Sequence, residues 1–264
     1  MREYRIEEKV ERRRRHREDT KPERLLPKDV LHPLYYIQLS ISWPIATGKE
    51  GVICSILFSM SPLREIETRG GTYFAHIDAT VDKGAEIGAG TKIWAGAHIF
   101  SGAKIGESCI VGEGVGIESG AMLGDFSKVQ SGVRLYGGVE AGDYVFFGPN
   151  ATTTNDRNPR AFGDWELSKT VIDTGASIGA NATLIAGNHI GALSLVAAGS
   201  VVSRDVQPGS IVLGNPARFH GWVDVSGAVI SRDPERPDEV AQMLVDPRAC
   251  IETYLQRKKA GLTQ

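Results

Sequence analysis

Large aliphatic residues recur every six positions along the middle of the chain. Ten of them fall on one register, and Ala141 and Phe147 continue it less strictly. The ten are Val81, Ile87, Ile93, Ile99, Ile105, Val111, Ile117, Leu123, Val129 and Leu135. A period of six fits neither an amphipathic helix nor a simple alternating strand. Fixed, short self-similarity of this kind is typical of a parallel β-helix built from hexapeptides.

A second pattern accompanies the first, because the residue four places after each aliphatic residue is small or β-branched. Those places hold Ala85, Thr91, Ala97, Ala103, Cys109, Val115, Ala121, Ser127, Val133, Val139, Val145 and Ala151. The many glycines around them are expected to serve turns that need a positive φ. Three hexads would form one triangular coil, and successive coils would stack at about 4.8 Å. One coil cannot bury its own inner side, so stability has to come from contacts between neighbouring coils.

The register stops after Thr152 and resumes at Ile172. Residues 153–170 are polar and contain Asn, Asp, Pro and Gly. A loop of this length inside a repeat array is generally functional. The resumed register predicts two more coils, with aliphatic positions at Ile172, Ile178, Leu184, Ile190, Val196 and Val202.

The two ends of the chain lack the hexad. Residues 1–72 begin with a dense mixture of both charges, and we interpret them as an extension that is disordered, or not native if the protein starts at Met60. The repeat domain is then 73–223, followed by a tail at 224–264. Within the tail, helical spacing of apolar residues predicts a short helix covering the last coil, at Ile251, Tyr254 and Leu255.

Composition excludes several function classes. The 264 residues include 30 Lys and Arg against 32 Asp and Glu, which gives no reason to expect nucleic acid or membrane-surface binding. The apolar stretches Leu31–Ile45 and Val52–Met60 are too short to insert across a bilayer. The three cysteines, Cys54, Cys109 and Cys250, form no disulfide framework, so a cytoplasmic protein is expected. Cys109 occupies a small-residue position and is expected in the core.

Eight local segments carry a resemblance that is more specific than the repeat. They are KIWAGAHI at 92–99, VQSGV at 129–133, LYGGV at 135–139, FGPN at 147–150, TNDRNPR at 154–160, GASIGANA at 175–182, VVSRDV at 201–206 and GNPAR at 214–218. In this order they resemble the bacterial hexapeptide-repeat N-acetyltransferases that acetylate the 3-amino group of nucleotide-linked sugars. The resemblance implies a left-handed β-helix, a homotrimer with sites between adjacent subunits, acetyl-CoA as co-substrate and no metal.

Two branches of that family differ near Gln130. Enzymes acting on UDP-linked 3-amino-glucuronates usually carry Gln-Asn-Asn where this chain has Gln130-Ser131-Gly132. The Ser-Gly form is more similar to enzymes acting on dTDP-linked 3-amino-3,6-dideoxyhexoses, which we favour. Gly137 departs from the family, which generally has an acidic residue there. Another acceptor for N- or O-acylation therefore stays open.

His98 is the predicted catalytic residue, because imidazole titrates in the range that proton transfer needs. A substrate-contacting role is the alternative. The predicted acceptor-binding residues are outward-facing aromatics, the Gln of the 129–133 segment and polar residues of the inserted loop, namely Trp94, Gln130, Tyr136, Asn155, Asn158 and Arg160. By analogy with the family, coenzyme A lies along the later coils, near Ala182, Ala198, Arg204 and Arg218.

Two other function classes are conceivable for a β-helix of this type, a zinc lyase and a non-catalytic scaffold. The γ-class carbonic anhydrases share this type of fold but bind zinc through three histidines, two of them close in sequence. His76, His98, His189 and His220 contain no such close pair, which argues against a zinc lyase. A non-catalytic β-helix scaffold is disfavoured by the inserted loop, the Ile-Trp…His segment and the Asn-Pro-Ala-Arg segment.

Overall fold

The described part of the chain begins with a β-hairpin. The computed structural model describes residues 63–262, so the interpretation of residues 1–59 and of a start at Met60 lies outside the described range. Strand β1 (Leu63–Thr68) pairs antiparallel with β2 (Gly71–His76), and β2 opens the first coil. The expected boundary between residues 72 and 73 falls inside this hairpin, whose first strand begins at Leu63, the first described residue.

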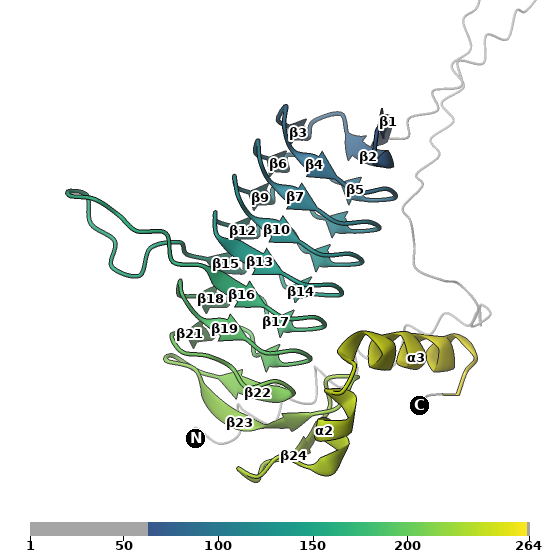
Figure 1. The fold of residues 1–264 in the computed structure, drawn as a ribbon, viewed down its shortest axis with the longest axis vertical. Helices are drawn as coiled ribbons and strands as arrows, with labels where there is room; N and C mark the ends of the chain where they lie inside the picture. Colours follow the sequence, from purple (N-terminus) through teal and green to yellow (C-terminus); the bar gives the residue numbers. More distant parts are fainter. Residues whose placement is uncertain (1–62, 263–264) are drawn as a thin grey trace, which may run out of the picture. The chain divides into compact units, whose positions relative to one another are not determined.

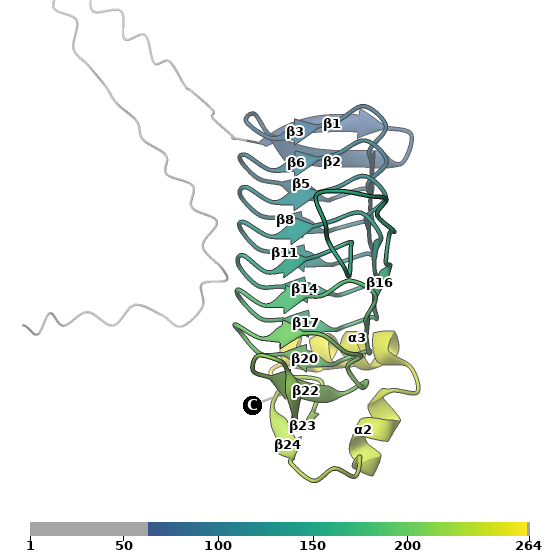
Figure 2. The ribbon, with the colours of Figure 1, turned by 90° about the vertical axis from the view of Figure 1, so that its left-hand side faces the viewer.

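The predicted parallel β-helix is confirmed, with three sheets forming the three walls of the coils (Figures 1 and 2). From β2 the first sheet continues through β5 (Lys92–Ile93), β8 (Ile110–Val111), β11 (Lys128–Val129), β14 (Phe146–Phe147), β17 (Ser177–Ile178), β20 (Leu195–Val196) and β22 (Ser210–Leu213). The second sheet contains β3 (Thr80–Val81), β6 (His98–Ile99), β9 (Gly116–Ile117), β12 (Arg134–Leu135), β15 (Thr152–Thr153), β18 (Thr183–Leu184) and β21 (Val201–Val202). The third contains β4 (Glu86–Ile87), β7 (Lys104–Ile105), β10 (Met122–Leu123), β13 (Val139–Ala141), β16 (Thr170–Ile172) and β19 (His189–Ile190).

The core lies along the inside of the coils. In the two-residue strands the second residue points inward, and the aliphatic positions of the hexad from Ile93 onward are almost all buried there with the small positions. Phe147 is the largest fully buried side chain. Cys109 is confirmed as a core residue, since it is fully buried, and this burial raises the pKa of its thiol to about 11. Its Sγ lies 3.1 Å from the carbonyl oxygen of Gly124.

The glycines serve two different purposes, of which we expected one. Gly90, in a turn, adopts a positive φ of 73°. Gly88, directly after an aliphatic residue, does not, so the expected reason is wrong there. A side chain at Gly88 would place its Cβ 2.5 Å from the carbonyl carbon of Gly106 in the next coil. Glycine is needed at this corner because adjacent coils stack too closely for any Cβ.

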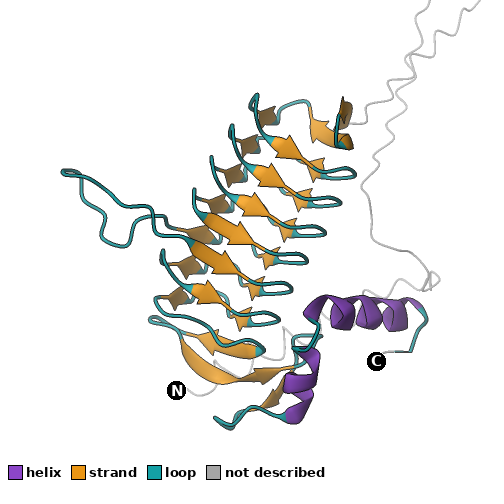
Figure 3. Cartoon of the chain, viewed as in Figure 1, coloured by secondary structure: helices purple, strands orange, loops and turns teal. Residues whose placement is uncertain are grey.

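The C-terminal tail contains two helices, where one was expected (Figure 3). The last parallel strand is followed by antiparallel β23 (Arg218–Val223) and β24 (Val229–Ser231), then by α2 (Asp238–Met243) and α3 (Pro247–Lys259). Two apolar residues of α2 pack against Leu193 and Trp222. Within residues 63–262, neither helix has the length and apolar composition that crossing a bilayer requires.

The predicted helix exists, but it does not cover the last coil. Arg248 on α3 forms an ion pair with Asp143 at 2.5 Å and lies 5.8 Å from the centre of the Phe126 ring. Both partners belong to turns of the middle coils, so α3 lies alongside the β-helix. The helix buries no residue completely, but its Cys250 and Ile251 pack against the cluster that Leu193 and Trp222 form with α2 at the end of the core.

Candidate functional site

The outer side of the second sheet positions the predicted catalytic histidine. His98 is the first residue of β6 and points outward, because the second residue, Ile99, occupies the core. Its side chain is 37% exposed. The imidazole stacks on the ring of Phe100, with 3.8 Å between ring centres. The stack restricts the orientation of the imidazole and leaves one edge of the ring accessible.

A carboxylate assigns the two ring nitrogens of His98 different roles. Asp82 Oδ1 lies 3.0 Å from His98 Nε2. An ionised carboxylate only accepts hydrogen bonds, so a neutral His98 carries its proton on Nε2 and a lone pair on Nδ1. Within the described residues no group bonds to Nδ1. This nitrogen can accept a proton from a bound molecule, and Asp82 would stabilise the resulting imidazolium.

Sequence reasoning missed Asp82, although a signal for it exists. Strands one coil apart pair directly, as Thr80 does with His98, and Asp82 follows Thr80 by two residues. An Asp sixteen residues before a His therefore lies in the adjacent coil and reaches the His diagonally. The same offset joins His189 Nε2 to Asp173 Oδ2 at 2.7 Å on the third sheet. The His–Asp pair by itself does not mark a site, and the surroundings of His98 have to distinguish it.

The other predicted acceptor-binding residues flank the second sheet. Trp94 and Gln130 directly follow β5 and β11, so they lie at the corner between the first and second sheets, two coils apart. Tyr136 follows β12 at the opposite corner, where Asp82 and Phe100 also lie. The backbone N–H of Tyr136 donates to Thr153 Oγ1 at 2.9 Å. The structure thus brings these aromatic and polar residues to the edges of the sheet that carries His98.

The inserted loop leaves the β-helix between β15 and β16, at the corner of Tyr136 (Figure 1). Its base is anchored, because the N–H of Ser168 donates to the carbonyl of Asn155 and the side chain of Leu167 packs on Gly138. The tip is exposed. There Asn158 donates its N–H to Asp156, and the guanidinium of Arg160 contacts only the neighbouring carbonyl of Pro159. The base of the loop lies beside the Tyr136 turn, whereas among the described residues neither Asn158 nor Arg160 is hydrogen-bonded to His98.

The residues assigned to coenzyme A lie in later coils. Arg204, just after β21, and Ala198 and Arg218 are exposed. Ala182 is fully buried, and its backbone N–H and carbonyl are already hydrogen-bonded to Gly179 and Thr152. Five strand spacings separate β6 from β21, which corresponds to about 24 Å along the stack. An extended coenzyme A can span such a distance.

Two further groups near His98 were not anticipated. Arg134 is the outward residue of β12, in the same column as His98 on the second sheet. Glu118 follows β9 at the corner that also holds Phe100 and Tyr136, and within residues 63–262 its carboxylate has no ion-pair or hydrogen-bond partner. Glu118 is therefore an acidic side chain one coil before Tyr136, and Tyr136 is itself followed by Gly137 and not by an acidic residue.

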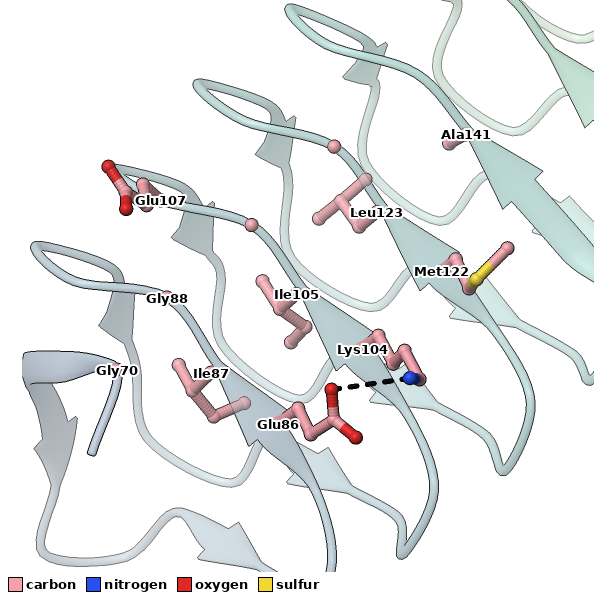
Figure 4. A pocket seen from close by; sticks show the side chains of 12 residues that line it. Gly70, Glu86, Ile87, Gly88, Lys104, Ile105, Glu107, Met122, Leu123 and Ala141 are labelled. Carbon is pink, nitrogen blue, oxygen red and sulfur yellow. Dashed lines mark ion pairs between the residues drawn. The ribbon is translucent and has the colours of Figure 1, made fainter. Parts of the chain in front are cut away.

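A shallow hollow lies elsewhere, on the third sheet (Figure 4). It is lined mainly by glycines and aliphatic residues of the first coils, and its charged pair, Glu86 and Lys104, is already joined at 3.3 Å. None of the residues predicted for catalysis or binding lines it. Within the described residues, no group of three His, Cys, Asp or Glu side chains is arranged to hold a metal ion.

One family model matches part of the repeat region. Residues 84–119 match the model of the bacterial transferase hexapeptide family, described as six repeats. The matched segment runs from the turn before β4 to the turn after β9 and therefore includes His98, Phe100 and Glu118.

Curated relatives are similar over the repeat region. A dTDP-3-amino-3,6-dideoxy-α-D-galactopyranose 3-N-acetyltransferase from Aneurinibacillus thermoaerophilus is 48% identical over 65 residues, which is 25% of this chain and 31% of that protein. A 2,3,4,5-tetrahydropyridine-2,6-dicarboxylate N-acetyltransferase from Clostridium perfringens is 48% identical over 54 residues, or 20% and 23% of the two chains. The chain thus spans less than a third of the length of these two relatives.

Solved structures of other proteins are similar to part of this chain. One is a UDP-N-acetylglucosamine acyltransferase, LpxA, from Bacteroides fragilis, with a TM-score of 0.49 and 22% identity. The match covers 57% of this chain and 61% of that one.

Proposed function

We propose that this protein transfers the acetyl group of acetyl-CoA to the 3-amino group of a nucleotide-linked sugar, with a dTDP-3-amino-3,6-dideoxyhexose as the favoured acceptor. The observation that carries the proposal is His98, within the segment that matches the transferase hexapeptide model, held by Asp82 and with no partner for Nδ1 among the described residues. The similarity to an acetyltransferase of a dTDP-linked 3-amino sugar supports the choice of acceptor. The proposal includes a cytoplasmic location and use of the product in surface polysaccharide synthesis.

The chemistry needs few protein groups. The neutral amine attacks the thioester carbonyl, so that a C–N bond forms and, when the tetrahedral intermediate collapses, the C–S bond breaks. His98 Nδ1 takes the proton that the amine loses, and the departing thiolate of coenzyme A takes up a proton at the end. Asp82 stabilises the charged imidazole through Nε2. Holding amine and thioester in contact supplies much of the rate, because a bimolecular encounter becomes an oriented one.

The experiment that tests the function is thiol release from acetyl-CoA with a panel of acceptors. The panel contains dTDP- and UDP-linked 3-amino sugars, including the 3-amino-glucuronate, together with L-serine as an acceptor of a different class. We expect the highest kcat/KM with the dTDP-linked 3-amino-3,6-dideoxyhexose, and a product that has gained one acetyl group by mass spectrometry. The proposal would be contradicted if L-serine were the only acceptor that caused thiol release, or if none of the acceptors in the panel did.

The proposed active form is a homotrimer whose sites are shared between subunits. The outer side of the first sheet exposes Ile110 and Phe146. Contacts between copies would cover such apolar side chains. We expect light scattering of the purified protein to give three times the mass of the chain. A monodisperse monomer with full activity would rule out a shared site.

A further inference from the structure

A gap in the second sheet positions an arginine next to His98. The outward positions of three consecutive strands hold His98, Gly116 and Arg134. Because Gly116 has no side chain, Arg134 folds back over it: its Cδ and Cζ lie 3.2 and 3.4 Å from the point where a Cβ of residue 116 would be. Gly116 is buried by this cover, although it faces outward.

The covering side chain places a positive charge one strand spacing from the histidine. Gly116 pairs directly with His98 in the adjacent coil, and neighbouring strands lie about 4.8 Å apart. The guanidinium therefore occupies the space that a side chain between His98 and Arg134 would fill. The carboxylate of Asp82 lies next to His98 as well, but it is already hydrogen-bonded to the imidazole.

The guanidinium has unused binding capacity. Among residues 63–262, the side chain of Arg134 has no hydrogen-bond, ion-pair or aromatic partner. An arginine side chain is always charged, and its planar set of N–H donors matches the paired oxygens of a phosphate or carboxylate. The side chain is exposed and lies over Gly116, where it can meet a ligand that the described residues do not supply.

We propose that Arg134 is a positioning residue that binds a paired-oxygen anionic group of the acceptor and thereby sets its amine at His98. This rests on the proposed function, which makes the acceptor a nucleotide-linked sugar. Two groups of such an acceptor have the required chemistry, namely the diphosphate and, if the sugar is a uronate, its carboxylate. Arg134 performs no proton transfer in this role.

The test combines two variants that disturb the same contact in different ways. Arg134→Gln removes the charge, whereas Gly116→Ala keeps it and pushes the flexible end of the guanidinium aside, at a position without left-handed backbone. We expect both to raise the KM for the acceptor, and Arg134→Gln to do so by about 10- to 100-fold, since hydrogen bonds to charged groups are strong. Arg134→Lys should restore part of the loss. The KM for acetyl-CoA and the melting temperature should stay unchanged, as in the control Lys104→Gln on the third sheet.

Binding of dTDP, UDP and thymidine by calorimetry separates the two anionic groups and does not depend on turnover. A diphosphate contact predicts that Arg134→Gln weakens dTDP or UDP binding by a similar factor and leaves thymidine binding unchanged. A carboxylate contact predicts unchanged diphosphate binding and a raised KM only for the UDP-linked 3-amino-glucuronate. Unaltered binding and unaltered KM in both variants, with normal transfer in the wild type, would overturn the role of Arg134 alone. A wild type that neither binds the nucleotides nor transfers acetyl groups would overturn the proposed function together with it.

Discussion

His98→Asn is expected to lower the turnover number for acetyl transfer by about 10²- to 10⁴-fold, the range that a general base typically contributes. The outward position of His98 means that the variant should melt at nearly the wild-type temperature. The rate of the wild type should fall at low pH, as Nδ1 becomes protonated, and this acidic limb should be absent in the variant. Steady-state thiol release across a pH series measures both effects.

Two comparisons separate a base from other roles of His98. His189→Asn removes a histidine with the same type of Asp partner on the third sheet and should leave turnover unchanged. Asp82→Asn should reduce turnover, because an amide can donate to Nε2 and move the imidazole proton to Nδ1. A rise in the KM for the sugar without a change in kcat would indicate binding only. Wild-type turnover and an unchanged pH profile in His98→Asn would exclude both roles.

Phe147→Ala is expected to destabilise the β-helix by about 3–5 kcal/mol, the usual cost of removing a large buried aromatic side chain. Phe147 is the largest fully buried residue, and its register neighbours in the adjacent coils are Val129 and Ile178. The small and aliphatic side chains around it cannot collapse into the space without moving the stacked backbone. Urea denaturation gives the change in free energy of unfolding.

The matched control makes the same substitution outside the core. Phe162 in the inserted loop is 78% exposed, so Phe162→Ala should change the free energy of unfolding by no more than about 0.5 kcal/mol. An equal loss in both variants would mean that the inner side of the β-helix does not carry the stability. A loss in neither would mean that the coils around Phe147 repack.

The hexad pattern was sufficient for the repeat, because each coil has the same requirements wherever it occurs. An aliphatic residue fills the interior and a small residue fits at the corner, so local sequence alone predicted the coils, the buried Cys109 and the interruption between β15 and β16. The repeat also placed His98 outward, since its neighbour Ile99 satisfied the inward position. The tail was predicted less well. Its helix has little apolar surface and is held by the Arg248–Asp143 ion pair, which joins residues far apart in the sequence.

The candidate site was also predicted only in part from the sequence. Sequence alone identified His98, Trp94 and Tyr136 as outward residues of hexads, because the repeat assigns inward and outward positions. Only the tertiary structure showed that Asp82 holds His98 and that Arg134 lies over Gly116. Both contacts join side chains of different coils, and their formation depends on coil register, rotamer and the space left by a missing Cβ. A period of six specifies which way a side chain points, whereas the partner that it meets is set by how the coils stack.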